Sequence, residues 1–288
     1  MKKILTILLT LLFISGCENT VLNIDYDSIN RMKLNSQELP FDIHSREYML
    51  VDLSDMQVMY ADRNDLKMYP ASLTKIVTLD VVLNLTDDLY DLSHVTYDQV
   101  EDLISQDASL AYIQRDFDYT LKDLLYALVL PSGADGALAL ENYFSARGID
   151  LVEQMNLQAE KLGCKNSHFV NTTGLHEDDH YTSLDDLFLF LMDILKFEDG
   201  REIMESLWHR LEDGTMVYTT MGVAHKDPDV DVLGGKTGYT PEAGQNIIVF
   251  YKNRAKSYVL LLGNAMGKYS NNEYWHFEDT LNIFEQLY

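Results

Sequence analysis

The chain has 288 residues, of which 47% are hydrophobic and 11% aromatic, so it can bury a substantial core in one large or two small domains. This aromatic content argues against disorder. The 46 acidic and 22 basic residues give a formal net charge of -24. Because such a surface repels a phosphate backbone, nucleic acid is not expected as a partner.

The N-terminus has the pattern of a secretory signal. Lys2 and Lys3 precede an apolar run over residues 4–14, and Ser15-Gly16-Cys17 follows. The run is shorter than the ~20 residues that a membrane-spanning helix needs. The ending ISGC resembles a lipobox, so we expect residues 1–16 to be a lipoprotein signal peptide and Cys17 to carry lipid. The alternative is a plain signal peptide with a chance cysteine.

The chain has only two cysteines, Cys17 and Cys164. If Cys17 is lipidated, Cys164 has no partner, so we expect no disulfide. An exported protein with two cysteines could instead pair them. Neither cysteine has the neighbours of a zinc cluster.

The predicted elements follow a tether and begin with two strands. Residues 18–44 are polar with little periodicity, which indicates a lipidated N-terminus and tether over residues 17–45. Residues 48–53 and 57–61 read as two strands, joined by a hairpin turn at Ser54-Asp55. The catalytic domain is expected to span residues 46–288.

A block of helices follows, and two strands and a last helix end the chain. From Ser72 the apolar residues have helical spacing, and further helices are predicted over 120–129, 133–143, 151–162 and 183–196. Residues 246–251 and 257–262 predict a hairpin, and residues 273–288 a final helix. The order favours an α+β fold, with an antiparallel sheet flanked by helices and a helical subdomain of roughly residues 78–225 between its first and last strands.

The stretch YPASLTKIVT places Ser72 three residues before Lys75. On a helix these positions share a face, so the lysine amine can meet the serine hydroxyl. A lysine with a lowered pKa can take the proton of a serine nucleophile. Such a spacing is common by chance, and Ser72 alone could equally be the N-cap of a buried helix.

Two downstream segments extend the pattern. Ser132 follows Pro131 in LVLPSGAD, where a lone serine before a helix is usually an N-cap. Lys236-Thr237-Gly238 lies in GGKTGYTPEAG, where a lysine and a threonine could hold a carboxylate and the glycines could admit a substrate backbone. Taken alone, this segment reads as a glycine-rich turn.

Together, S-x-x-K, a Ser-Gly turn and K-T-G in this order form a combined signature. The chain resembles the serine D-alanyl-D-alanine carboxypeptidases, which are low-molecular-mass penicillin-binding proteins and share their fold with the serine β-lactamases. The resemblance covers residue 46 to the C-terminus. It includes the blocks DLLYALVLPSGAD and NTTGLHEDDHYTS.

The resemblance implies a role for each matching residue. Ser72 would attack the carbonyl between two terminal D-alanines of a peptidoglycan stem peptide, Lys75 would accept its proton, and Ser132 would relay a proton to the leaving amine. An acyl-enzyme would form, and water would then release the shortened peptide. No metal or organic cofactor is implied.

The resemblance also implies the groups that bind substrate. Lys236 and Thr237 would bind the terminal carboxylate, with Gly238 beside them. The oxyanion hole would use the backbone N–H groups of Ser72 and Tyr239. β-Lactam antibiotics would act as acylating inhibitors, and the lipid on Cys17 would hold the protein to the outside of the cell membrane.

The middle motif departs from the family pattern. The family usually has Ser-x-Asn, and here the residues are Ser132-Gly133-Ala134. Ala134 has no amide to hold Lys75 or the substrate backbone, and whether the adjacent Asp135 replaces it is open. Removing one orienting amide costs a few kcal/mol, which would weaken catalysis without abolishing it.

His176 and His180 in GLHEDDHYTS have an H-x3-H spacing that suits zinc on a helix. Gly174 before them and Thr182-Ser183 after them indicate a loop instead. The family carries a similar segment without metal. We therefore expect a structural loop near the site.

Two rival functions remain at the level of sequence. One is a catalytically impaired peptidoglycan-binding or sensor lipoprotein, motivated by Ala134. The other is a β-lactamase or endopeptidase of the same fold, although no motif for an added deacylation base is present. Classical family members often have a second, C-terminal β domain and an amphipathic anchor, and we expect neither here.

Overall fold

The computed structural model describes residues 24–222 and 230–288. Its centre is a five-stranded antiparallel sheet in the order β2-β1-β9-β8-β7. The strands are β1 (Glu47–Asp52), β2 (Gln57–Asp62), β7 (Val230–Thr240), β8 (Gly244–Asn253) and β9 (Lys256–Ala265). This is the predicted α+β arrangement, with the first and last strands of the chain in one sheet.

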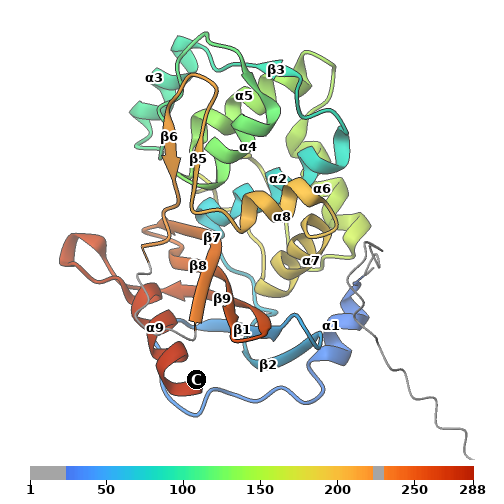
Figure 1. Ribbon diagram of the computed structural model, residues 1–288, viewed down its shortest axis with the longest axis vertical. Helices are drawn as coiled ribbons and strands as arrows, with labels where there is room; N and C mark the ends of the chain where they lie inside the picture. The colour runs from blue at the N-terminus through green and yellow to red at the C-terminus, as the bar shows by residue number, and fades with distance from the viewer. Residues whose placement is uncertain (1–23, 223–229) are drawn as a thin grey trace, which may run out of the picture.

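Most of the helices lie between β2 and β7 in the chain and form one half of the molecule, above the sheet in Figure 1. The short 3-10 helix η1 (Ala71–Leu73) opens this half, and two small strand pairs, β3–β4 and β5–β6, belong to it. The helices of this half are α2 (Thr74–Leu85), α3 (Tyr97–Ser105), α4 (Leu121–Val129), α5 (Ala134–Ser145), α6 (Leu151–Leu162), α7 (Leu184–Ile194) and α8 (Glu198–Met204). The small strands are β3 (Leu92–Ser93), β4 (Tyr119–Thr120), β5 (Trp208–Arg210) and β6 (Met216–Tyr218).

The sheet divides the core into two parts because side chains alternate along each strand. On β1, Met49 and Val51 join the core shared with the helical half, while Tyr48 and Leu50 join the core on the other face. That other face is covered by α9 (Trp275–Leu287), which contributes Ile283 and a further buried aromatic side chain. The sheet is therefore buried on both faces.

Helix α2 is the centre of the helical half. Its residues 74–83 are all buried, and it packs against α4, α6 and α7. Burial on every side shows that other elements surround the helix. Because η1 leads directly into α2, the segment around Ser72 is fixed by the most enclosed element of the fold.

The segment predicted as a tether contains a folded part. Helix α1 (Tyr26–Met32) begins at Asp25, whose carboxylate caps it, and its Ile29 is fully buried. The helix contacts α7 and β2, so it lies at the β2 edge of the sheet (Figure 1). Part of the segment 17–45 is thus packed on the domain, and Cys17 lies outside the described residues.

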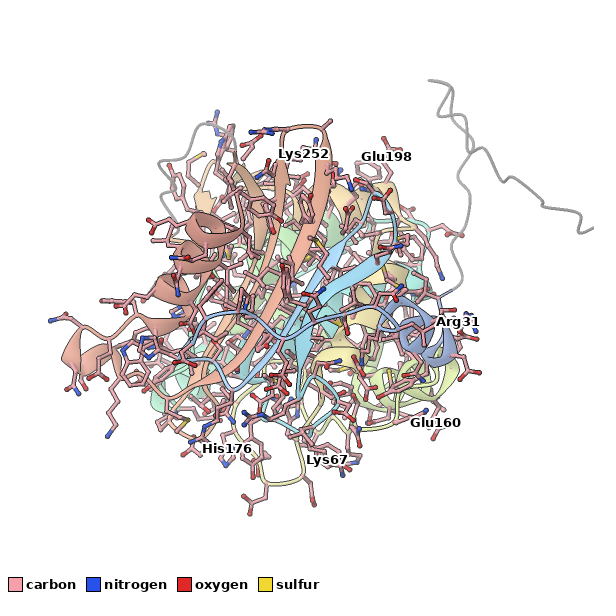
Figure 2. All side chains as sticks on the ribbon, turned by 90° about the horizontal axis from the view of Figure 1, so that it is seen from below. Arg31, Lys67, Glu160, His176, Glu198 and Lys252 are labelled. Carbon is pink, nitrogen blue, oxygen red and sulfur yellow. The ribbon has the colours of Figure 1, made fainter. Side chains whose placement is uncertain are left out.

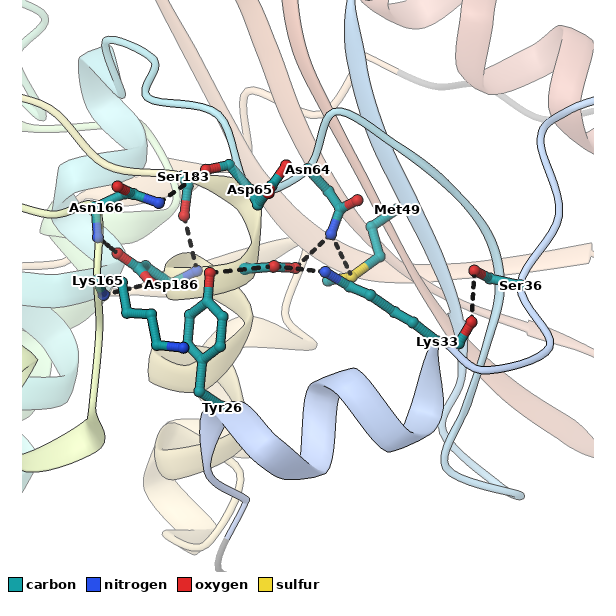
Figure 3. A network of polar contacts seen from close by, with 11 residues as sticks. Tyr26, Lys33, Ser36, Met49, Asn64, Asp65, Lys165, Asn166, Ser183 and Asp186 are labelled. Atoms are coloured by element: carbon teal, nitrogen blue, oxygen red, sulfur yellow. Dashed lines mark hydrogen bonds and ion pairs between the residues drawn. The ribbon is translucent and has the colours of Figure 1, made fainter.

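Buried polar contacts fasten α1 to the domain (Figure 3). The Lys33 amine, just after the helix, donates to the Asp185 carboxylate at 2.5 Å, and the Tyr26 hydroxyl donates to the same group at 3.4 Å. Asn64, beyond β2, donates to the other Asp185 oxygen. Asp185 is in the first turn of α7 and its side chain is 1% exposed, so α1, β2 and α7 share one buried anion.

Helix α7 begins as predicted. The Ser183 side chain accepts a hydrogen bond from the Asp186 N–H, which is an N-cap. The Asp186 carboxylate accepts instead from the backbone of Lys165 and Asn166. It ties down the chain after α6, where Cys164 is a free, half-buried thiol.

Candidate active site

Ser72 lies in the middle of η1, in a turn with unusual backbone geometry. The preceding Ala71 has a φ of +47°, a region that residues with a Cβ rarely adopt. The Thr74 hydroxyl donates to the Ala71 carbonyl at 2.8 Å and holds the turn. The N-cap of α2 is Leu73, without any side-chain hydrogen bond, so the interpretation of Ser72 as a helix cap is wrong.

Lys75 lies at the start of α2 and points back at Ser72. Its Nζ lies 3.1 Å from the Ser72 Oγ and donates to the carbonyl oxygen of Thr173 at 2.5 Å. Burial lowers the pKa of Lys75 to about 7, although the negative charge of Asp135 opposes the shift. An amine with that pKa is about half neutral at pH 7, and the neutral form can accept a proton.

Ser132 lies in the turn that precedes α5 and has a φ of +65°. The N-cap of α5 is Gly133, so the N-cap interpretation of Ser132 is wrong. The Ser132 Oγ is buried and has no hydrogen-bond partner among the described residues. A buried hydroxyl without a partner carries a desolvation cost that a bound substrate could relieve.

Ala134 and Asp135 occupy the first turn of α5, and both are buried. The Asp135 carboxylate accepts hydrogen bonds from the backbone N–H groups of Ala111 at 2.8 Å and Ile113 at 3.2 Å. It therefore holds the loop before β4. In the described part of the chain it makes no hydrogen bond to Lys75, so its oxygens do not replace the missing amide.

The K-T-G segment is part of a strand. It pairs with β8, where Lys236 lies opposite Ile248, Thr237 opposite Ile247 and Gly238 opposite Asn246. The interpretation of this segment as a glycine-rich turn is therefore wrong. A Cβ on Gly238 would lie 2.8 Å from the Pro70 carbonyl oxygen and 3.1 Å from the Ser72 nitrogen. Glycine at this position lets the edge strand β7 contact the turn that carries Ser72.

Lys236 is fully buried, and its Nζ donates to the carbonyl oxygen of Thr237 at 2.7 Å. Burial lowers the pKa of Lys236 well below its usual range, and the charge of Lys75 lowers it further. Two buried amines near each other favour a state in which they do not both carry charge. A substrate carboxylate would favour the protonated form of Lys236.

One site residue has no sequence signal. The Thr220 hydroxyl lies 2.6 Å from the Thr237 hydroxyl, and the Thr220 N–H donates to the Leu130 carbonyl at 2.9 Å. Thr220 thereby connects β7 to the turn that holds Ser132. Tyr239, the next β7 residue after Gly238, is half-buried, and its ring is 4.6 Å from that of Tyr269.

The two histidines lie in a loop beside the nucleophile turn. His180 is buried, its Nδ1 accepts from the Val170 N–H at 3.1 Å, and its Nε2 lies 2.7 Å from the Thr74 hydroxyl. Because the backbone donates to Nδ1, the proton is on Nε2, and His180 donates to Thr74. Burial lowers the pKa of His180 to about 4.

Since protein groups use both His180 nitrogens, this ring supports the turn before Ser72 and does not suit a metal. The His176 ring packs edge-on against Tyr69 at 4.7 Å. Figure 2 shows His176 at the rim of the molecule, near the segment that carries Lys67. Among the described residues, no group of three or more His, Cys, Asp or Glu side chains could hold a metal ion.

Comparisons with known proteins support this picture. A family model described as D-alanyl-D-alanine carboxypeptidase matches residues 32–263. The D-alanyl-D-alanine carboxypeptidase DacF of Bacillus subtilis is 28% identical over 203 residues, covering 69% of this chain and 52% of the relative. DacD of Escherichia coli is 28% identical over 224 residues, covering 73% and 55%. The chain spans about half the length of the curated relatives it matches.

Solved structures show the same fold. The Streptomyces K15 DD-transpeptidase has a TM-score of 0.74 at 22% identity, covering 86% of this chain and 98% of that one. Penicillin-binding protein D2 from Listeria monocytogenes, in its ampicillin-bound form, has a TM-score of 0.70 at 25% identity, with 86% and 98% covered. The likeness to the K15 structure extends over nearly the whole of that shorter enzyme.

Proposed function

The chain belongs to the D-alanyl-D-alanine carboxypeptidase family, and from this premise we propose that it removes the terminal D-alanine from peptidoglycan stem peptides. The observation that carries the proposal is the pair of Ser72 and Lys75. A buried amine with a pKa near 7 lies 3.1 Å from a hydroxyl oxygen. That pair suits a serine nucleophile with a lysine base.

The proposed reaction has two halves. The Ser72 oxygen bonds to the carbonyl carbon between the two D-alanines, and its proton passes to Lys75. The C–N bond then breaks, and the leaving D-alanine takes a proton by way of Ser132, which leaves an acyl-enzyme. In the second half, water bonds to the acyl carbon and gives a proton to Lys75. The bond between that carbon and the Ser72 oxygen then breaks, the oxygen takes the proton back from Lys75, and the shortened peptide leaves as a carboxylic acid.

Binding is proposed to use β7. Lys236 and Thr237 would hold the terminal carboxylate, with Gly238 beside them, and the substrate backbone would lie along β7. The N–H groups of Ser72 and Tyr239 would stabilise the negative oxygen of the tetrahedral intermediate. The close approach of Gly238 to the Ser72 nitrogen supports this arrangement.

The test is acylation by a fluorescent penicillin followed by turnover of a pentapeptide. We expect stoichiometric labelling of the wild type and none of Ser72→Ala, with a matching thermal melt to show that the variant folds. Released D-alanine is then measured from a stem pentapeptide. Absence of Ser72-dependent labelling would contradict the proposed nucleophile.

Ala134 favours one alternative, a protein that binds stem peptides with little turnover. The two functions differ in the pentapeptide assay: labelling with penicillin but no release of D-alanine supports the binder. Rapid hydrolysis of the penicillin would point to a β-lactamase. Cleavage of cross-linked stem peptides into single peptides would point to an endopeptidase.

We also propose that the protein acts outside the cytoplasmic membrane and is anchored there by lipid on Cys17. The family's substrate is in the cell wall, and the N-terminal pattern supports export. No helix among the described residues is both long and apolar enough to cross a bilayer. Replacing Cys17 by alanine in the producing cell should release the protein from the membrane fraction.

A further inference from the structure

The orientation of Lys75 depends on few contacts. Among the residues that the structure describes, its Nζ donates to two acceptors, the Ser72 hydroxyl and the Thr173 carbonyl. The side chain of Ala134 offers no hydrogen bond, and the Asp135 carboxylate binds backbone N–H groups of another loop. Thr173 therefore supplies the only acceptor on Lys75 in this part of the chain other than the proposed nucleophile itself.

The side chain of Asn171 holds the backbone on both sides of the Thr173 carbonyl. The Asn171 Oδ1 accepts hydrogen bonds from the Thr173 N–H at 3.2 Å and the Gly174 N–H at 2.7 Å. Its Nδ2 donates to the carbonyl of Leu175 at 3.0 Å. An asparagine that binds the backbone two and three residues ahead fixes the conformation of a turn.

This turn also contacts the segment that precedes Ser72. Gly174 has a φ of +82°, and a Cβ there would lie 2.0 Å from the Ala71 carbonyl oxygen. The turn therefore lies against the nucleophile turn on one side, and on the other its Thr173 carbonyl accepts a hydrogen bond from Lys75. A change in its conformation would alter the geometry between Ser72 and Lys75.

A second contact holds the same turn on α2. The Thr78 hydroxyl, one helical turn after Lys75, donates to the Thr172 carbonyl at 2.9 Å. The Thr172 hydroxyl donates to Glu141 of α5 at 2.5 Å. Both helices of the site thus hold the backbone that ends in the Thr173 carbonyl.

We propose that Asn171 is a positioning residue for the reaction: it fixes the Thr173 carbonyl that orients Lys75, a task that an amide at position 134 would otherwise share. The inference rests on the proposed function. The 171–175 turn, and not Asp135, then compensates for the amide that is absent at Ala134. Asn171 acts through the backbone and touches neither Ser72 nor Lys75 through any described hydrogen bond.

The test is a double-mutant cycle with the penicillin acylation rate constant as its readout. We expect Asn171→Ala to lower this rate constant by about tenfold to hundredfold, because Lys75 loses its fixed acceptor. Ala134→Asn alone should change it by less than about threefold. In the Ala134→Asn background, Asn171→Ala should cost less than about threefold, since the introduced amide takes over.

Asn156→Ala is the matched control. Asn156 also holds this loop, because its side chain binds the backbone N–H and carbonyl of Phe169 at 3.0 and 2.8 Å, but it lies away from the turn at Thr173. We expect a similar loss of thermal stability and an unchanged acylation rate. Thr78→Val replaces a side chain by one of nearly equal size and provides a second test if Asn171→Ala fails to fold. It should also slow acylation, and Ala134→Asn should restore most of the lost rate.

Two acylation results overturn the inference: a wild-type rate in Asn171→Ala, or an equal loss with and without Ala134→Asn. The second result would mean that Asn171 serves only the folding of the loop. NMR of ε-13C-labelled lysine, with Lys75 assigned by Lys75→Arg, gives a readout that needs no activity. The chemical shift of Lys75 should change in Asn171→Ala and not in Asn156→Ala, and equal shifts in the two variants overturn the inference. A wild type that penicillin does not acylate contradicts the proposed function instead.

Discussion

The chemical character of Lys75 comes from its surroundings and not from its residue type. Lysine in water has a pKa near 10.4, at which the neutral amine is rare at pH 7. The side chain here is 2% exposed, and burial lowers the pKa to about 7. Asp135 of α5 faces it and favours the ammonium, while the charge of Lys75 in turn lowers the pKa of Lys236 of β7.

The pH dependence of acylation should follow this pKa. A base accepts a proton only when it is neutral, so the acylation rate constant should rise with pH, with a midpoint near 7, and then level off. Rates with a fluorescent penicillin from about pH 5.5 to about 9.5 check this. A lysine with its ordinary pKa would give a rate that still rises at the upper limit, which would contradict the expected plateau.

Ser132 and Ala71 show a second property at this scale. Both have positive φ values, +65° and +47°, although neither is glycine. Backbone in this region costs about 1–3 kcal/mol for each residue, persists only where the surrounding structure imposes it, and concentrates at functional sites. The strain lies on both sides of the site, in the turn that carries Ser72 and in the turn before α5.

At the scale of elements, α2 contains a buried carboxylate whose protonation affects stability. Asp80 is fully buried, and the Gln158 amide donates to it and to Asp193 of α7, at 2.9 Å each. Burial and the charge of Asp193 raise the pKa of Asp80 well above its usual range. Burial opposes ionisation of Asp193 too, but contacts from Lys196 and Asn84 lower its pKa.

A pKa that is higher in the folded than in the unfolded state fixes the direction in which stability changes with pH. The contribution of Asp80 to stability is fully present below its unfolded pKa, near 3.9, and is lost as the pH rises through the folded pKa. We therefore expect Asp80→Asn, which resembles the protonated acid, to raise the free energy of unfolding at pH 7.5 by about 1 kcal/mol. This corresponds to a Tm higher by about 2–4 °C.

Thermal melts at pH 7.5 and at about pH 4 test this expectation, and the gain should shrink at the lower pH. Asp193→Asn is the matched control. It removes a carboxylate that binds the Lys196 amine at 2.6 Å, so it should lower the Tm at pH 7.5. A lower Tm for Asp80→Asn at pH 7.5 would contradict a raised pKa of Asp80 in the folded state.

The strands and helices with strong periodicity were predictable from sequence, and the K-T-G strand was not. Apolar runs rich in β-branched and aromatic residues over 48–53 and 246–251 indicated β1 and β8, and helical spacing indicated α2, α6 and α7. In β7, however, Gly234, Gly235 and Gly238 lower strand propensity and suggested a turn. Each glycine is required by a close approach, since a Cβ would lie 2.3, 1.9 and 2.8 Å from a backbone oxygen.

The motif residues of the candidate site could be proposed from the sequence because each is identified by the chemistry of its own side chain. Ser72, Lys75, Ser132 and Lys236 follow from residue types in a fixed order. The Thr173 carbonyl left no such signal, because every residue has one and only the fold selects which one meets Lys75. The tether offered too little apolar periodicity to predict α1, whose attachment depends on Asp185, over 150 residues away.

At the scale of the whole molecule, α1 joins the two halves. It contacts β2 of the sheet and α7 of the helical half, and its principal ion pair is protected from water. The side chains of Lys33 and Asp185 are 19% and 1% exposed. Loss of one partner would leave a buried carboxylate with less compensation.

We expect Lys33→Met to lower the free energy of unfolding by about 2 kcal/mol. Arg31→Met is the control on the same helix. Arg31 is paired with Asp25 at 3.8 Å, with both side chains about two-thirds exposed, and such pairs contribute about 0–1 kcal/mol. Urea unfolding of both variants measures the difference, and equal effects would show that the buried pair is no stronger than the surface pair.

The position of α1 has a mechanical consequence. The sheet order places β2 at one edge and β7 at the other, so α1 fastens the halves along the edge farthest from the proposed substrate strand. The opposite edge is held as well, because Gly238 of β7 packs against the turn that carries Ser72, where a Cβ would lie 3.1 Å from the Ser72 nitrogen. A displacement of one half against the other would therefore break the α1 attachment or shift β7 against Ser72, so both edges of the sheet fix the position of β7 relative to Ser72.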